Sequence, residues 1–304
     1  MKQRLNTGGV INGVVITVMT VMSMIILCAP AMAVPTLSDN ISRKIAETIA
    51  LPDERDNVLQ NAIAAVKAGV PEDIIAPVIE RTLENGVSGD GLVEMLQALA
   101  AAREKDLPPE PLAGKILEGL VKNVGEKSII RAMERVEERM EFSAGLAKGL
   151  GMSKEKREDL IIETAGAIAA GMDRDSLRDI FSVMAGDRSS GRLAPVQIME
   201  MVKAASGYGV DSRKVGKYAA ALIEDKDADK GDIAKFLKDL SERAYKGISD
   251  NDPDDIVEKY MENMSSTGED ETGDAIGEEN MADENNGGSS GGGGEHSGDE
   301  GGPH

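Results

Sequence analysis

The chain has 304 residues, enough for one or two ordinary domains, and carries a formal net charge of -20. This charge argues against nucleic-acid partners, because proteins that bind nucleic acids present basic patches to the phosphates. With no Trp, three Phe and four Tyr, the chain must build its core from aliphatic side chains, Met and Ala, and it offers few aromatic platforms for stacking sugars or bases.

Residues 1–33 have the features of a secretory signal peptide. Two basic residues open the segment, an apolar run follows from Val14 to Cys28, and Ala31-Met32-Ala33 fits the small-x-small cleavage rule. Cleavage there would start the mature chain at Val34. The alternative is an uncleaved membrane anchor, because residues 10–28 are almost long enough to span a bilayer. We therefore expect a bacterial protein that is exported to the periplasm or the extracellular space.

Residues 34–264 are predicted to form one all-α domain. Apolar residues recur there at three- and four-residue spacing, as at Leu92, Met95, Leu96 and Leu99, and no run alternates convincingly with period two. We expect about ten helices in hairpin pairs. They include a longer helix over residues 127–150 and a short one over residues 251–264.

The predicted joints between these helices follow one pattern. A Gly with positive φ ends a helix, an apolar residue plugs the joint, and Pro, Ser or Asp opens the next helix. Joints that follow this pattern in full or in part are Gly69-Val70-Pro71, Gly86-Val87-Ser88, Leu107-Pro108, Val124-Gly125, Gly151-Met152-Ser153, Gly171-Met172-Asp173, Leu193-Ala194-Pro195 and Gly209-Val210-Asp211.

A repeat of 37 residues relates residues 68–96 to residues 105–133. The two copies share apolar positions and turn residues, as expected of a repeated helix pair whose surface is unconstrained. The matched pairs are Val70 with Leu107, Pro71 with Pro108, Ile75 with Leu112, Ile79 with Ile116, Leu83 with Leu120, Val87 with Val124, Leu92 with Ile129 and Val93 with Ile130. The repeat predicts an irregular, solenoid-like stack. The alternative is a plain helical bundle whose turns look alike by chance.

The second copy carries a recognisable segment: Asp106-Leu-Pro-Pro-Glu-Pro-Leu112, then Lys115, Glu118-Gly119-Leu120 and Lys122. This LPxxPLxxKxxEGLxK-type segment resembles one in uncharacterised exported bacterial proteins that have a signal peptide and α-helical repeats. The resemblance covers roughly residues 68–150 and implies no activity.

Two glycines in this segment, Gly114 and Gly119, lie within the predicted helix. A helical glycine costs about 1 kcal/mol relative to alanine. We therefore expect a close approach of two helices at both positions. On the solvent side, Glu118 and Lys122 are spaced to form an i,i+4 ion pair.

Common catalytic residues are missing from the predicted domain. The two histidines are His296 and His304, and the one cysteine is Cys28. Their positions exclude Ser-His-Asp and Cys-His catalysis and most zinc sites from the mature body. We expect a non-enzymatic protein without a cofactor; an enzyme would have to be a carboxylate hydrolase.

The best metal candidate is an acidic segment containing Asp225, Asp227 and Asp229. It resembles a calcium loop, but an EF-hand needs Gly at the sixth position and Glu at the twelfth, where this chain has Lys230 and Phe236. The three aspartates are thus a weak calcium candidate. The alternative is an acidic turn in which Asp caps the next helix.

Residues 265–304 form an acidic tail rich in Gly and Ser. They contain eleven carboxylates and no Lys or Arg, and their few apolar groups cannot offset the entropy of ordering, so we expect disorder. Such a tail solvates the protein, and it could also bind a basic partner.

These patterns together predict an exported, non-enzymatic α-helical repeat protein that serves as an interaction or structural module of the bacterial cell envelope. Its partner would be an envelope or extracellular protein. Contact with a membrane would occur only through an uncleaved N-terminal segment, and the oligomeric state stays open. The alternative is a weak divalent-cation-binding or buffering protein that acts through its acidic turns and tail. Methionines on the apolar helix faces should fill the core, although a Met-lined groove could hold a partner helix.

Overall fold

The computed structural model describes residues 37–186, 193–246 and 253–266. These ranges contain α-helices and one short 3-10 helix, and no strand, which confirms the all-α class. The predicted signal peptide and residues 267–304 of the predicted tail lie outside the described residues. The elements are α2 (Asp39–Thr48), α3 (Pro52–Lys67), α4 (Glu72–Glu84), α5 (Gly89–Glu104), α6 (Glu110–Val121), α7 (Glu126–Ala147), η1 (Lys148–Leu150), α8 (Lys154–Ala169), α9 (Arg174–Gly186), α10 (Pro195–Gly207), α11 (Ser212–Glu224), α12 (Lys230–Lys246) and α13 (Pro253–Ser266).

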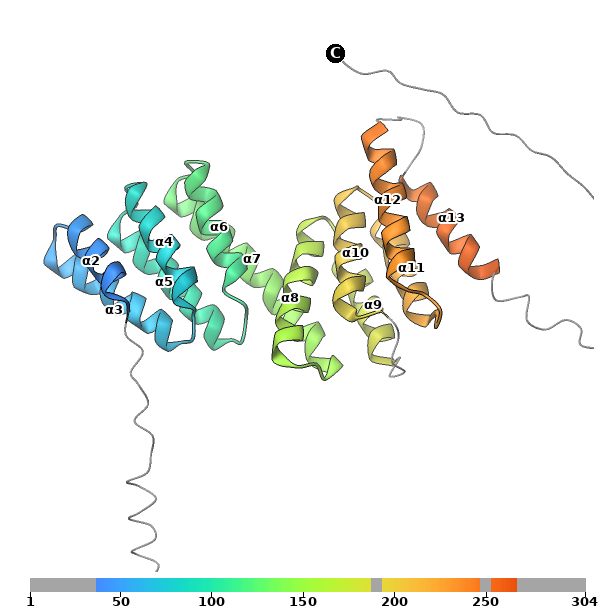
Figure 1. Cartoon of the computed structure of the whole chain (residues 1–304), viewed down its shortest axis with the longest axis horizontal. Coiled ribbons are helices and arrows are strands. Elements are labelled where there is room, and N and C mark those ends of the chain that lie inside the picture. The colour runs from blue at the N-terminus through green and yellow to red at the C-terminus, as the bar shows by residue number, and fades with distance from the viewer. Residues whose placement is uncertain (1–36, 187–192, 247–252, 267–304) are drawn as a thin grey trace, which may run out of the picture. The chain divides into compact units, whose positions relative to one another are not determined.

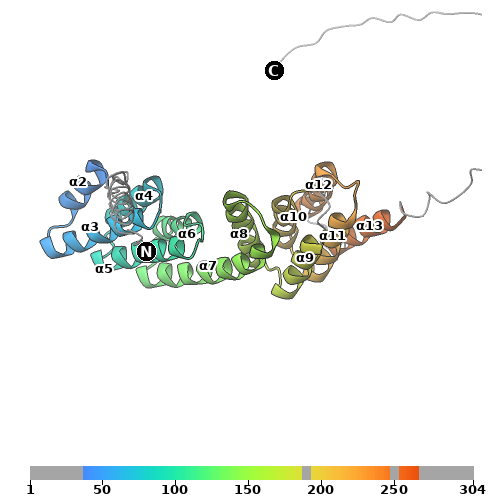
Figure 2. The same ribbon diagram turned by 90° about the horizontal axis from the view of Figure 1, so that it is seen from below.

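The helices alternate between two layers (Figures 1 and 2). Helix α4 packs between α2 and α6, while α5 packs between α3 and α7. The same order continues along the chain, where α10 packs between α8 and α12, and α9 packs against α11 and α7. The predicted stack of hairpin pairs is therefore confirmed. All contacts described here lie within residues 1–262, one of the two compact units of the chain.

Helix α7 joins the two halves of this stack. It has 22 residues and packs against α5 and α6 as well as against α8 and α9. The long helix predicted over residues 127–150 is thus confirmed, with η1 forming its last turn. Figure 2 shows α7 running beneath both α6 and α8. None of the helices in the described ranges is long and apolar enough to cross a membrane.

The 37-residue repeat is visible in the helix positions. Helix α5 begins at Gly89 and α7 begins at Glu126, and the core positions of α4 recur in α6. Ile75, Ile79, Leu112 and Ile116 are all fully buried. A buried aliphatic side chain of this size stabilises the fold by about 2 kcal/mol relative to an exposed one, so the shared pattern is the shared core.

The predicted helix ends are confirmed at five joints where glycine follows a helix, but not at Val124-Gly125, where Gly125 has φ -61° and is the N-cap of α7. Gly69, Gly86, Gly151, Gly171 and Gly209 all have positive φ. At Gly69 and the following residue, two backbone bonds close the helix: Gly69 N–H donates to Val66 O at 3.0 Å and Val70 N–H donates to Ala65 O at 3.0 Å. This pair of bonds is the Schellman motif. In the second copy Asp106 (φ 57°) and Asn123 (φ 52°) adopt the same backbone conformation without glycine.

The apolar plugs at the joints differ in burial. Val70, Leu107, Met172 and Val210 are buried as expected, but Val124 is 39% exposed. The plug prediction is therefore wrong at Val124. Backbone geometry alone defines that joint, because Val124 N–H still donates to Gly119 O at 2.9 Å.

The two helical glycines of the second copy have opposite environments. A Cβ atom on Gly119 would lie 2.6 Å from Ile129 Cγ1 of α7, whereas a Cβ on Gly114 would meet nothing within 4 Å. The predicted close approach is confirmed at Gly119 and is wrong at Gly114, because Gly114 lies on the outer face of α6 and is exposed.

Candidate functional site

An apolar groove of about 490 Å³ lies between α4 and α6. Its size falls within the range of about 300–1,000 Å³ typical of ligand pockets. The most exposed large apolar side chain of the described residues, Val121, lies at this groove with 80% of its surface exposed. The residues that line the groove, called here the α4–α6 groove, are Pro77, Arg81, Asn85, Leu117, Leu120, Val121 and Asn123.

The helical period of α6 explains how one helix supplies both core and groove. Leu112, Ile116 and Leu120 recur at four-residue spacing and face the core. Leu117 and Val121 share the same spacing but are rotated by one position, which directs them toward α4. They are half-buried and exposed, respectively.

The opposite wall of the groove comes from α4. Pro77 lies inside this helix, where its ring replaces a backbone N–H donor. Arg81 is the one charged side chain among the described residues that line the groove. Its Nη1 lies 3.2 Å from Glu84 Oε2, and both side chains are about half exposed or more, so this ion pair contributes at most about 1 kcal/mol.

Charged side chains of α6 gather away from the lining of the groove. Lys115 and Lys122 both donate hydrogen bonds to Glu118, which confirms the predicted pair between Glu118 and Lys122, at 2.5 Å. The hydrogen bond from Lys115 and then that from Lys122 lower the pKa of Glu118 to about 2. The exposed apolar residues are therefore the feature that sets this groove apart from the charged surface around it.

The groove residues Leu117 and Val121 had no functional interpretation in the sequence, although a signal was present. In the first copy the equivalent positions, 37 residues earlier, are Glu80 and Glu84. The same surface positions are therefore acidic in the first copy and aliphatic in the second. Recognising the groove still required knowing that α4 and α6 are neighbours.

The predicted calcium candidates take part in turn and capping hydrogen bonds. Asp225 Oδ1 accepts a hydrogen bond from Asp227 N–H at 2.9 Å. Asp229 caps α12, because its Oδ1 accepts from Gly231 N–H at 2.6 Å while Asp229 N–H donates to Asp232 Oδ2 at 2.9 Å. Within the described ranges, no group of three or more His, Cys, Asp or Glu side chains is placed to hold a metal ion. The structure supports the capping interpretation of this turn.

The methionines fill the core and do not line the groove. No methionine is among the groove residues, and most of the body methionines are buried. Those buried are Met95, Met133, Met140, Met172, Met199 and Met201.

Comparison with known proteins identifies no relative from which a function could be transferred. No protein-family model, curated protein or solved structure matches the chain.

Proposed function

We propose that this protein is an exported, non-enzymatic helical-repeat module that binds a protein of the bacterial cell envelope through the α4–α6 groove. The observation that carries the proposal is the exposure of Val121 beside Leu117 in a groove of about 490 Å³. Exposed apolar surface in a concave site is favoured as a binding surface, because burying it on association releases water from both partners. Stacked helices suit this role because they present extended surfaces.

The chemistry of the groove favours an amphipathic helix as the occupant. Leu117, Leu120 and Val121 would contact aliphatic side chains spaced three or four residues apart on that helix. Arg81 would pair with a carboxylate of the partner beside this apolar stripe, since no acidic side chain is among the described groove residues. An exposed pair adds orientation more than affinity.

A non-enzymatic role is supported by the residues available for chemistry. Residues 34–264 contain no His and no Cys, so the usual general base near neutral pH is missing. The groove itself contributes no carboxylate pair that could perform acid–base chemistry.

The test replaces both apolar groove residues with the acids of the first copy. The variant Leu117→Glu/Val121→Glu should fold normally, because the equivalent positions of α4 already carry Glu80 and Glu84. The control, Gln60→Glu/Ala64→Glu, adds the same charge on exposed positions of α3 in the other layer.

Full-length protein, both variants and a photo-crosslinking residue at position 121 would be used on envelope extract. We expect one partner to crosslink through an amphipathic helix. That purified partner should bind the control as tightly as wild type and the groove variant at least tenfold more weakly, measured by calorimetry. Equal binding by the groove variant would refute the assignment of the groove. Failure of any envelope protein to crosslink would refute the proposed function.

A further inference from the structure

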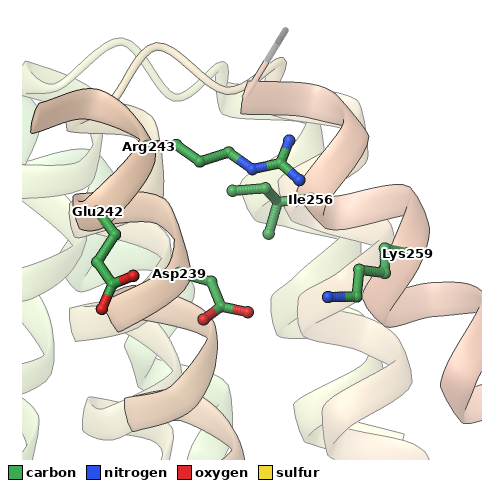
Figure 3. A pocket seen from close by; sticks show the side chains of 5 residues that line it. All are labelled: Asp239, Glu242, Arg243, Ile256 and Lys259. Atoms are coloured by element: carbon green, nitrogen blue, oxygen red, sulfur yellow. The ribbon is translucent and has the colours of Figure 1, made fainter. Parts of the chain in front are cut away.

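A second cavity lies at the C-terminal end of the helical stack, between α12 and α13 (Figure 3). It has a volume of about 180 Å³ and is lined by Asp239, Glu242, Arg243, Ile256 and Lys259. The side chains of Arg243, Asp239 and Lys259 extend into the space between the two helices, while Glu242 points away from α13. The groups that face the cavity are therefore two cations and one carboxylate.

The two cations have no partner within the described part of the chain. Arg243 Nη1 is buried and has no hydrogen-bond acceptor there, and neither Arg243 nor Lys259 makes an ion pair with a described residue. A guanidinium carries five N–H donors, and a buried donor without an acceptor is costly. An unpaired arginine is unusual in a protein of net charge -20, where carboxylates are abundant.

The carboxylate in the cavity, that of Asp239, already accepts a hydrogen bond from a tyrosine. Tyr260 Oη donates a hydrogen bond to Asp239 Oδ2 at 2.9 Å. Burial raises the pKa of Tyr260, with the bond to Asp239 adding to the effect, so the phenol remains a donor. Ile256, which is 1% exposed, forms an apolar wall of the cavity beside these charged groups.

We infer that this cavity binds a small oxyanion, of phosphate or carboxylate type, between Arg243 and Lys259. The planar guanidinium matches two oxygens of such a group, and an ammonium supplies a second charge-assisted bond. The volume equals about six water molecules in the liquid, enough for a small anion and too little for a folded partner. This site is separate in sequence and in chemistry from the α4–α6 groove, so its test is independent of the proposed function.

The experiment titrates the full-length chain with inorganic phosphate, and separately with acetate, at constant ionic strength set by chloride. Binding would be followed by calorimetry and by tyrosine emission, which is accessible because the chain has no Trp. We expect saturable binding of at least one of the two anions. Arg243→Gln should weaken it about tenfold or more, because one charge-assisted hydrogen bond or more is lost, and Lys259→Gln should weaken it less.

Lys235→Gln provides the matched control, since it removes the same charge from an exposed position of α12 that does not line the cavity. A further variant, Arg243→Met, should lose anion binding and raise the Tm in anion-free buffer by about 2–4 °C, because it removes an unpaired, partly buried charge. No saturable binding of either anion, or an equal loss in Lys235→Gln, would overturn the assignment. Circular dichroism of each variant would establish that the helices are intact.

Discussion

The contact between α2 and α4 and the groove between α4 and α6 occupy equivalent places in the repeat, yet their surfaces differ. In the first, Lys44 Nζ lies 3.9 Å from Glu84 Oε1 and both side chains are partly exposed. In the second, Val121 stands at the position of Glu84 and is 80% exposed. The core residues beneath both places are the same kind of aliphatic side chain. The difference teaches that this fold fixes the interior of each repeat and leaves the outer face of its helices free to vary.

The largest effect should come from the close contact between α6 and α7 at Gly119, a position where the first copy has Thr82. Gly119→Ala places a methyl group 2.6 Å from Ile129 Cγ1. Ile129 is β-branched and lies in a helix, so its side chain cannot easily rotate away from the new methyl group. We expect a loss of about 2 kcal/mol in the free energy of unfolding, measured by urea denaturation.

The control for this change is Gly114→Ala on the same helix. Nothing lies within 4 Å of a Cβ at Gly114, so the higher helix propensity of alanine should raise stability by about 0.5–1 kcal/mol. Equal responses of the two variants would mean that Gly119 does not mark a close helix contact.

A smaller effect is expected at the equivalent position of the first copy. Thr82 stands where the second copy has Gly119, and its Oγ1 is buried without a hydrogen-bond partner among the described residues. Thr82→Val keeps the shape and removes the unsatisfied hydroxyl, so stability should rise by about 1 kcal/mol. Thermal unfolding would measure the gain, and a decrease in Tm would show that the hydroxyl has an acceptor in solution.

The joints after α4 and α6 give a third comparison, in which the expected changes in stability are similar or smaller. Gly86 has φ +67° and open space around it, so Gly86→Ala should cost about 1 kcal/mol from backbone strain alone. Asn123, its counterpart with φ 52°, is a residue type that tolerates this conformation, and Asn123→Gly should change stability by less than about 0.5 kcal/mol. Urea denaturation of both variants tests the pair, and a large gain in Asn123→Gly would reveal strain that the asparagine now bears.

The smallest effect should be the pH dependence contributed by Glu118. Its pKa is lowered from 4.5 to about 2, first by the hydrogen bond from Lys115 and then by that from Lys122. A depressed pKa in the folded state adds stability that is complete above pH 4.5 and is lost as the pH falls toward 2. The difference in Tm between Glu118→Gln and wild type should therefore shrink as the pH falls from 4.5 toward 2. Because Glu118 is exposed, the difference is small and should shrink further in high salt. A difference in Tm that stays constant across this pH range would show that the depressed pKa of Glu118 does not contribute to stability.

The features of the fold that could be predicted from the sequence are those that depend on a few neighbouring residues. The long helix α7, the positive φ of Gly69 and Gly86, and the capping of α5 by Ser88 are all properties of short segments. Ser88 Oγ, for example, accepts a hydrogen bond from Gly91 N–H at 3.0 Å, three residues away. The prediction failed at Gly114 and Val124 because their surroundings depend on where neighbouring helices lie.

The sequence by itself thus determined the all-α class, the 37-residue repeat and most helix ends, because hydrophobic period and turn chemistry act over a few residues. Tertiary packing decided which small residue is a close contact, which apolar residues of α6 remain exposed and which cations lack a partner. Leu117 and Leu120 are equally apolar in the sequence. They differ because the position of α4 leaves a groove beside Leu117 while Leu120 also reaches the core, and such a distinction depends on contacts between residues far apart in the chain.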